Sequence, residues 1–148
     1  MYKDLQLKII ERLRHDGRAS LREIAQELDT SATTVSKHVE RLEEQGILRG
    51  FKPILDYSKL GFPITIVTQI KAKGNLIPKI VETLKQDDCL THVYEITGEF
   101  DILAIGKFRD QESMNREIKR LLGHPAIEET NTSVVLSIVK EDAEIRLQ

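Results

Sequence analysis

One stretch of this sequence carries hydroxyl and cationic side chains at the spacing of a single helix face. Lys37, His38 and Arg41 follow Thr34 at i+3, i+4 and i+7, so all four would share one side of a helix. On recognition helices, short polar side chains near the N-terminus meet base edges, while Lys and Arg hold phosphates. The pattern predicts a DNA recognition helix, although an ordinary solvated helix face has the same periodicity. The residues expected to contact DNA are Ser31, Thr33, Thr34, Ser36, Lys37, His38, Arg41, Arg18 and Arg22.

Two short helices joined by a tight polar turn would position these side chains. Ser20 can cap the first helix, and Glu23 completes a capping box three residues later. Thr30 or Ser31 can cap the second helix, and Gly46 is suited to end it. The apolar positions that recur on one face of each helix are Leu21, Ile24, Ala25 and Leu28, and then Ala32, Val35, Val39 and Leu42.

A third amphipathic stretch precedes this pair and supports the helix-turn-helix interpretation. Leu5, Ile9, Ile10 and Leu13 have helical spacing, and residues 16–17 (Asp-Gly) end the pattern. Three helices would give the last one enough support to be presented rigidly. The N-terminal part is therefore predicted to be a DNA-binding helix-turn-helix domain.

Charge is balanced along the chain, which restricts how it can hold DNA. Residues 1–50 contain nine Lys and Arg against nine Asp and Glu, a net charge of 0, and residues 51–148 contain thirteen against fifteen, a net charge of −2. Affinity for phosphates must then come from the local placement of cations rather than from a strongly basic domain. We expect weak DNA binding by one copy and useful binding by a dimer or a larger assembly.

Composition indicates a globular chain without a cofactor. Hydrophobic residues make up 40% of the sequence and charged residues 31%, and no apolar run is long enough to span a membrane. No signal peptide is evident, so a cytoplasmic location is expected. The single cysteine, Cys89, cannot form an internal disulfide or a cysteine-rich zinc site, and we expect a buried or half-buried thiol. The sequence contains no phosphate loop, metal-spaced cluster or nucleophile motif, so we expect neither a metal site nor catalysis.

Beyond residue 50 the helical repeats give way to alternating strands and helices. Prolines and glycines mark residues 51–62 as a linker between a domain at 1–50 and a second domain at 63–148. The second domain is predicted to have strands at 64–72, 92–97, 101–108 and 132–139 and helices at 75–85 and 110–122. The order β-α-β-β-α-β predicts a ferredoxin-like antiparallel sheet with both helices on one face. The fold class is therefore α+β, in which a winged-helix-like domain of three helices precedes the ferredoxin-like domain. If the face of the sheet that the helices leave uncovered is apolar, it would need a partner.

Several phrases in this order resemble the Lrp/AsnC, or feast/famine, transcriptional regulators. Residues 41–48 read RLEEQGIL after the three helices, residues 60–61 (Leu-Gly) lie in the hinge, residues 97–101 read TGEFD, and residues 130–136 read TNTSVVL. Their order and spacing cover nearly the whole chain. The resemblance implies a bacterial or archaeal regulator whose C-terminal domains pair through their sheets into dimers, which assemble further into octamers.

The resemblance also implies an amino-acid effector bound at the turn of residues 97–101. A zwitterionic amino acid needs an acceptor for its ammonium group, which Glu99 or Asp101 could provide, and donors for its carboxylate, which backbone N–H groups near Gly98 could provide. The alternative is that Gly98 only permits a tight turn that Asp101 caps. Phe100 stands where many relatives carry tyrosine, which removes any contact through that hydroxyl. The residues expected at the effector site are Thr97, Gly98, Glu99, Phe100, Asp101, Thr130 and Thr132.

Two other classes of protein share parts of this plan. A branch with the same two domains resembles haem-pathway decarboxylases, whose chemistry would need histidines or arginines converging on a tetrapyrrole carboxylate. His15, His92 and His124 share no such motif. A ligand-sensing or assembly protein without DNA binding is the other alternative, but stand-alone sensing domains of the family lack the N-terminal helices that this sequence has.

Overall fold

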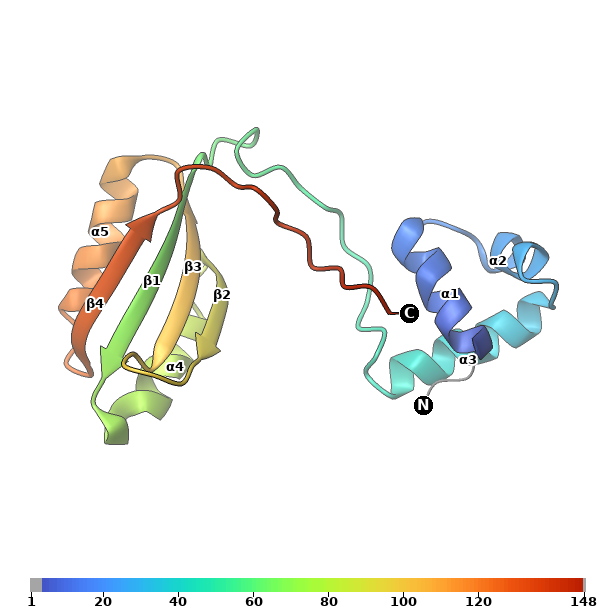
Figure 1. Cartoon of the computed structure of the whole chain (residues 1–148), viewed down its shortest axis with the longest axis horizontal. Helices are drawn as coiled ribbons and strands as arrows, with labels where there is room; N and C mark the ends of the chain where they lie inside the picture. The colour runs from blue at the N-terminus through green and yellow to red at the C-terminus, as the bar shows by residue number, and fades with distance from the viewer. Residues whose placement is uncertain (1–3, 148) are drawn as a thin grey trace. The chain divides into compact units, whose positions relative to one another are not determined.

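The structure, a computed structural model, describes residues 4–147, which form two compact units (Figure 1). The helical unit runs up to Ile54 and includes the segment from Ala143 onwards, and the sheet unit comprises Leu55–Asp142. Residues 1–3 and 148, which belong to the two predicted domain ranges, lie outside the described residues. No helix in the described part of the chain is long and apolar enough to cross a membrane.

The helical unit consists of the three helices that the sequence predicted. They are α1 (Asp4–His15), α2 (Leu21–Glu27) and α3 (Ala32–Glu44). The capping box of α2 is present, because Ser20 Oγ accepts a bond from the Glu23 N–H while the Glu23 carboxylate accepts one from the Ser20 N–H at 2.7 Å. These bonds favour the ionised carboxylate and so lower the pKa of Glu23 below its ordinary value.

The turn between α2 and α3 depends on one residue in the left-handed region. Asp29 has φ of 50°, a conformation that Asp tolerates better than most residues other than Gly. The Thr30 N–H then donates to the Ala25 carbonyl at 2.9 Å, which satisfies a carbonyl at the end of α2. The chain therefore passes from α2 into α3 within a few residues.

The sheet unit has the predicted ferredoxin-like order. All strand pairs are antiparallel, the strand order across the sheet is β2-β3-β1-β4, and both helices lie on the same side of the sheet (Figure 1). The β-α-β-β-α-β prediction is therefore confirmed. Its elements are β1 (Ile64–Ala72), the 3-10 turn η1 (Gly74–Leu76), α4 (Ile77–Lys85), β2 (Leu90–Glu95), β3 (Ile102–Phe108), α5 (Gln111–Leu122) and β4 (Ile127–Val134).

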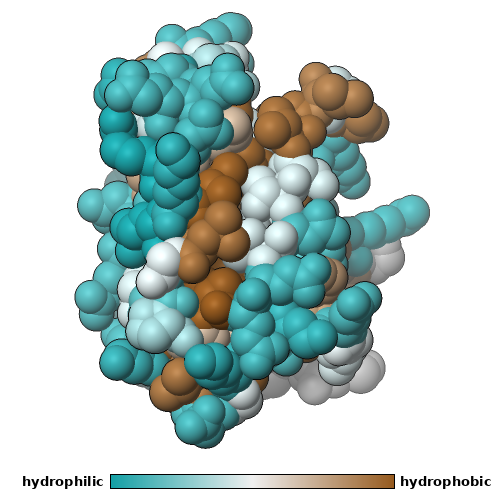
Figure 2. Space-filling model, turned by 90° about the vertical axis from the view of Figure 1, so that its left-hand side faces the viewer, coloured by the Kyte–Doolittle hydropathy of each residue, from teal (hydrophilic) through white to brown (hydrophobic). Residues whose placement is uncertain are grey.

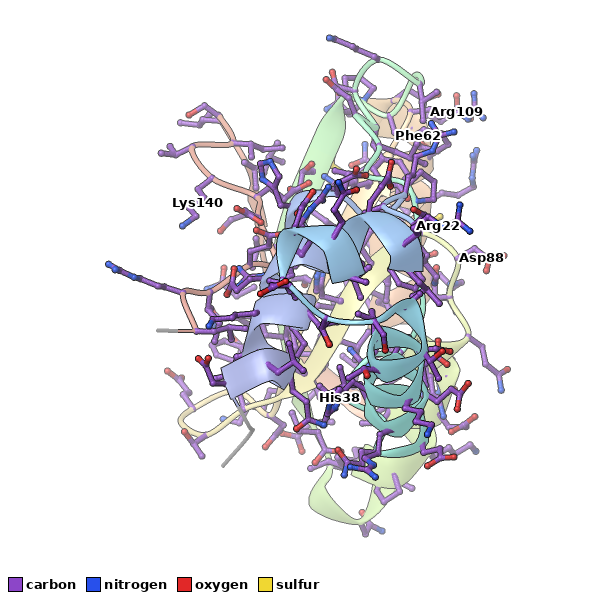
Figure 3. All side chains as sticks on the ribbon, turned by 90° about the vertical axis from the view of Figure 1, so that its right-hand side faces the viewer. Arg22, His38, Phe62, Asp88, Arg109 and Lys140 are labelled. Atoms are coloured by element: carbon purple, nitrogen blue, oxygen red, sulfur yellow. The ribbon has the colours of Figure 1, made fainter. Side chains whose placement is uncertain are left out.

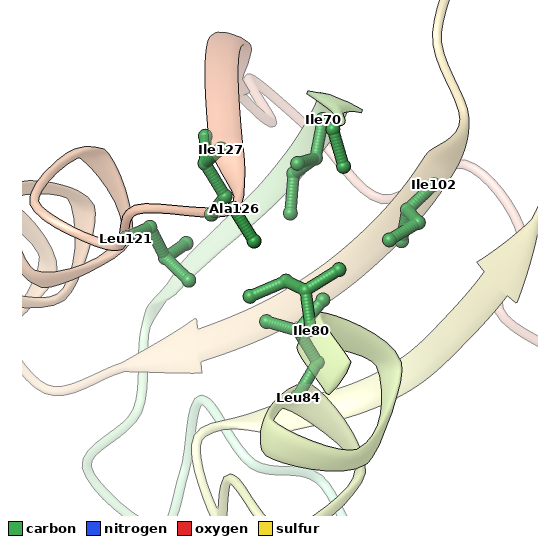
Figure 4. Close-up of a cluster of buried hydrophobic side chains, with 8 residues drawn as sticks. Ile70, Ile80, Leu84, Ile102, Leu121, Ala126 and Ile127 are labelled. Carbon is green, nitrogen blue, oxygen red and sulfur yellow. The ribbon is translucent and has the colours of Figure 1, made fainter. Parts of the chain in front are cut away.

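The core of the sheet unit lies between the sheet and its two helices. Ile70 of β1 and Ile102 of β3 contribute from the sheet, Ile80 and Leu84 from α4, and Leu121 from α5 (Figure 4). Each is at most 3% exposed, and full burial of such a side chain is worth about 1.5–3 kcal/mol. A neighbouring cluster joins Ile66, Phe108 and Met114.

The opposite side of the sheet, called here the open face, is covered by neither helix. Val67 of β1 and Leu103 and Ile105 of β3 are half-buried in its centre. Tyr94 of β2 stands beside Leu103 and is 51% exposed. The open face therefore has an apolar centre, as a sheet that pairs with another surface would need.

Strand β4 begins five residues earlier than predicted, at Ile127 rather than at 132. The predicted position was wrong because β4 is an edge strand whose exposed positions are polar, whereas the apolar run after it resembles a strand. The ladder pairs Thr132 with Thr68 and ends at Val134 opposite Ile66. Leu136 and Val139, inside the predicted strand, are exposed at 101% and 95%.

Exposed apolar side chains also occur near α5. Leu122 at its end is 53% exposed, and Val134 at the end of β4 is 52% exposed. Figure 2 shows an apolar strip bordered by hydrophilic side chains on this side of the molecule.

Two further expectations differ from the structure. The segment from Ala143 groups with the helical unit, where the Glu144 carboxylate lies 3.3 Å from Nη2 of Arg14 on α1, whereas the predicted second domain ran to residue 148. Cys89 is exposed rather than buried. Partial desolvation of its sulfur, reinforced by the Asp87 carboxylate, raises the pKa of the thiol and so disfavours a reactive thiolate.

Candidate DNA-binding helix and effector site

Helix α3 is fixed by the side that it buries. Val35 and Leu42 are fully buried, and Val35 shares the core of the helical unit with Ile9 of α1 and Ile24 of α2. Interiors are close-packed, so a helix held at two such points has little freedom to rotate about its axis. The polar side of α3 is therefore presented to solvent in one orientation.

Three of the predicted DNA-contacting residues form an exposed row along α3. Thr33, Lys37 and Arg41 are four residues apart, so they lie above one another on the solvent side. Neither Lys37 nor Arg41 forms an ion pair with another residue between positions 4 and 147. Their charges are therefore not compensated by ion pairs in the described part of the chain, and contact of this row with phosphates and base edges stays a prediction.

Three other predicted contacts already have partners within α3. Ser31 is the N-cap, with its Oγ accepting from the Thr34 N–H at 3.1 Å and lying 2.8 Å from Thr34 Oγ1. The Ser36 hydroxyl donates to the Glu40 carboxylate at 3.3 Å. These hydroxyls stabilise the helix itself, so a role at the DNA stays a prediction and would need rearrangement of the partners.

The remaining predicted DNA contacts, His38, Arg18 and Arg22, lie outside the exposed row of α3. His38 is half-buried and its Nδ1 is inaccessible, without a hydrogen-bond partner among the described residues. Arg22 is exposed on α2 (Figure 3), and the exposed Arg18 precedes α2 with its backbone N–H bonded to Asp16 at 2.9 Å. The two arginine side chains are available for phosphate contacts beside α3.

Acidic residues share α3 with the cations. Glu40, Glu43 and Glu44 are exposed, and a carboxylate near a phosphate opposes binding. Glu40 accepts the hydrogen bond from Ser36 within the helix. The affinity of a DNA contact made through α3 would therefore depend on which side of the helix faces the groove rather than on the net charge of the helix.

The turn of residues 97–101 connects β2 to β3 and is tied to β1 through Asp101. Gly98 has φ of 111°, a region that favours glycine, and a Cβ there would meet nothing within 4 Å. Asp101 donates its backbone N–H to the Ile70 carbonyl at 2.9 Å, and its carboxylate accepts from the Ala72 N–H at 2.8 Å. The Asp101 carboxylate therefore bonds to the end of β1 and not to the turn itself, which leaves the exposed Glu99 as the freer carboxylate of this turn.

The two threonines predicted for the effector site lie on the far side of β1. Thr130 pairs with Ile70 and Thr132 with Thr68, whereas the turn leads into β3 on the other edge of β1. Thr132 Oγ1 lies 2.8 Å from the fully buried Thr68 Oγ1, on the helix-covered side of the sheet. The structure therefore keeps Thr132 away from the turn, while Thr97 and Glu99 are exposed on it and Phe100 is half-buried.

A charged cluster in the sheet unit was not predicted. Arg120 pairs with Asp87 and Glu117, whose side chains are only 9% and 12% exposed. Burial, together with the neighbouring Asp87 carboxylate, raises the pKa of Glu117. The spacing of Glu117 and Arg120 is a local signal, but Asp87 lies 33 residues from Arg120, so no sequence pattern joins all three.

Comparisons with known proteins agree with this architecture. Residues 3–49 match the family described as winged helix-turn-helix DNA-binding, and residues 65–145 match the Lrp/AsnC ligand binding domain. An HTH-type transcriptional regulator of Pyrococcus furiosus is 44% identical over 139 residues, which cover 94% of each chain. The regulator Ptr1 of Methanocaldococcus jannaschii is 34% identical over 116 residues, 78% of each chain.

Solved structures show the same fold. AsnC of E. coli superposes with a TM-score of 0.86 at 23% identity, covering 99% of this chain and 97% of that one. A transcriptional regulator of Neisseria meningitidis, solved as a complex with L-Met, superposes with a TM-score of 0.91 at 19% identity and the same coverage.

A helix-turn-helix unit followed by a ligand-binding domain defines a DNA-binding transcriptional regulator. The chain belongs to the Lrp/AsnC family of such regulators. It is accordingly a regulator and not an enzyme, which sets aside the decarboxylase alternative.

Replacing Ser31 separates its role as a cap from a role at the DNA. Ser31→Ala should lower the free energy of unfolding by about 1 kcal/mol, as loss of an N-cap generally does, and should change DNA affinity less than Lys37→Ala does. Urea unfolding and DNA titration would measure the two effects, with Ser20→Ala at the cap of α2 as the matched control. Unchanged stability with strongly weakened DNA binding would instead assign Ser31 to the interface.

Proposed function

We propose that Thr33, Lys37 and Arg41 of α3 enter the major groove of DNA and that two copies of the chain bind one DNA site together. The observation that carries this proposal is the exposed, unpaired row on a helix whose opposite side fully buries Val35 and Leu42. Thr33 near the N-terminus of α3 is placed to meet base edges, and the two cations behind it are placed to hold phosphates. Arg18 and Arg22 add phosphate contacts from the segment before α2 and from α2.

Removing the two cations of the row should weaken DNA binding and make the affinity depend less on salt concentration. In Lys37→Ala/Arg41→Ala, affinity at moderate salt should fall about tenfold or more, and the slope of log affinity against log salt should become shallower by about 1 for each lost phosphate contact. Fluorescence anisotropy with promoter DNA at several salt concentrations would measure both.

The control is Lys79→Ala/Lys85→Ala, which removes the same charge from exposed positions of α4. This control should retain most of the affinity. Equal losses in both double variants would show a general charge effect and would contradict the assignment of the recognition row.

Pairing through the open face is the proposed route to the dimer. Its apolar centre of Val67, Leu103 and Ile105, with Tyr94 beside it, is not covered by either helix of the sheet unit. Two such faces can bury each other, and the two helical units then act on one DNA molecule. Joining two recognition helices makes the second contact intramolecular, which compensates for a helical region of zero net charge. Association of dimers into octamers would extend the same principle along the DNA.

A small molecule at the turn of residues 97–101 is the proposed effector. The exposed Glu99 supplies an acceptor for an ammonium group, and the backbone at Gly98 is open to a ligand because nothing fills the space at its Cβ position. An amino acid suits this chemistry, and the Neisseria meningitidis regulator of the same fold was solved with L-Met. Such a ligand would act by binding one state of assembly better than another.

Calorimetric titration with each of the twenty amino acids tests the effector. At least one should bind, and Glu99→Gln should weaken that binding about tenfold, since a charge-assisted hydrogen bond is worth about 1.5–3 kcal/mol. Glu95→Gln changes an exposed carboxylate on β2 and should leave binding unchanged. Absence of heat with every amino acid would contradict the proposed effector class.

A further inference from the structure

We propose that a cavity beside Lys107, at the other end of the sheet from residues 97–101, binds a small carboxylic acid with an apolar side chain. The cavity has a volume of about 340 Å³ and lies wholly within the sheet unit. Its lining includes Leu55, Tyr57, Phe62, Lys107, Ile138 and Glu141. We call it the Lys107 cavity.

Lys107 supplies a nearly buried cation. Its side chain is 10% exposed, and its Nζ lies 3.3 Å from Thr65 Oγ1, the residue opposite it on β1. The same Nζ is 3.0 Å from a Glu141 carboxylate oxygen and 5.8 Å from the centre of the Tyr57 ring. A buried ammonium group is costly without a counter-ion, so Lys107 holds a carboxylate at this position.

The carboxylate that occupies this position can be exchanged. Glu141 is 51% exposed on its side chain and belongs to a segment after β4 that has neither helix nor strand. A ligand carboxylate has the same charge and hydrogen-bonding atoms, so it can take the place of Glu141 while the charge of Lys107 stays compensated. Glu141 then returns to water, where an ionised carboxylate is well solvated.

The remaining walls are mixed, because Asp56 and Ser58 line the cavity beside an apolar part that suits a group of modest size. Tyr57 and Phe62 meet edge to face with ring centres 6.5 Å apart, and Leu55 and Ile138 also line the cavity. The guanidinium carbon of Arg109 lies over the Phe62 ring, 4.4 Å from the ring centre, and keeps the ring in place (Figure 3). A volume of about 340 Å³ is at the lower end of small-molecule pockets, which favours a molecule the size of an amino acid.

The Lys107 cavity is separate from the turn of residues 97–101. Strand β3 begins after that turn at Ile102, and five residues of extended strand between Ile102 and Lys107 span about 17 Å. The chain's own residues 55–58, together with Ile138 and Glu141, line the cavity at this end of the open face. A ligand here would therefore be a second small molecule, independent of one bound at Glu99.

Three related probes test the requirement for a carboxylate. L-leucine and 4-methylpentanoate share a carboxylate and an apolar branched chain, whereas leucinamide lacks the carboxylate. Calorimetry on the full-length protein should show binding of the first two and none of leucinamide at the same concentration. Equal binding of leucinamide, or no binding of any probe, would overturn the proposal.

Variants then assign the binding to the cavity. Lys107→Met should reduce the affinity for 4-methylpentanoate at least tenfold, while Lys119→Met, at an exposed lysine of α5, should leave it unchanged. Glu141→Gln should tighten binding several-fold, because it removes the competing carboxylate but not the cation; this result decides the matter if Lys107→Met does not fold. Weaker binding in Glu141→Gln, or loss of binding in Glu99→Gln with Lys107→Met unaffected, would overturn the proposal.

Discussion

The burial of Val35 and Leu42 is the constraint on which the DNA-binding surface depends. These two side chains fix the rotation of α3 about its axis, and the row of Thr33, Lys37 and Arg41 faces solvent as a consequence. The capping bonds of Ser20 and Ser31 set where α2 and α3 begin, and the left-handed Asp29 lies in the turn between the two helices. The small helical core thus determines which charged side chains of α3 face solvent, although the helical region has no net charge.

The sheet unit has one face that its helices cover and one face that they leave open. Its helices bury one side of the sheet, and the open face keeps an apolar centre that suits pairing with a second copy. The two ends of the sheet differ in chemistry, with Glu99 exposed on the turn at one end and the Lys107 cavity at the other. The segment after β4 carries Glu141, which pairs with Lys107, and then Glu144, which pairs with Arg14 of α1. The chain therefore passes from the helical unit into the sheet unit after Ile54 and returns to the helical unit at Ala143.

Sequence alone predicted the features that depend on neighbouring residues. The capping box at Ser20, a cap at Thr30 or Ser31 (the structure has Ser31) and a strand over residues 64–72 follow from patterns within a few positions. It failed for β4, because an edge strand tolerates polar residues and only the register with β1 shows where pairing ends. The side of the sheet that Thr132 faces follows from that same register.

Contacts between distant parts of the chain were likewise hidden from the sequence. The bond from the Ala72 N–H to Asp101 joins residues 29 positions apart, and the ion pair of Lys107 with Glu141 joins residues 34 apart. One signal for Lys107 is visible in the sequence, because it is a charged residue within the otherwise apolar strand β3. The side chains that surround it are known only from the folded chain.

A hydroxyl-radical footprint of the purified protein on the DNA upstream of its own gene tests the central claim most directly. Two recognition helices joined in a dimer should protect half-sites on one side of the duplex, separated by about one helical turn or a multiple of it. We expect protection of that spacing with the natural protein and its loss in Lys37→Ala/Arg41→Ala. No protection by a protein that remains folded and assembled, or protection that the double variant retains in full, would contradict it.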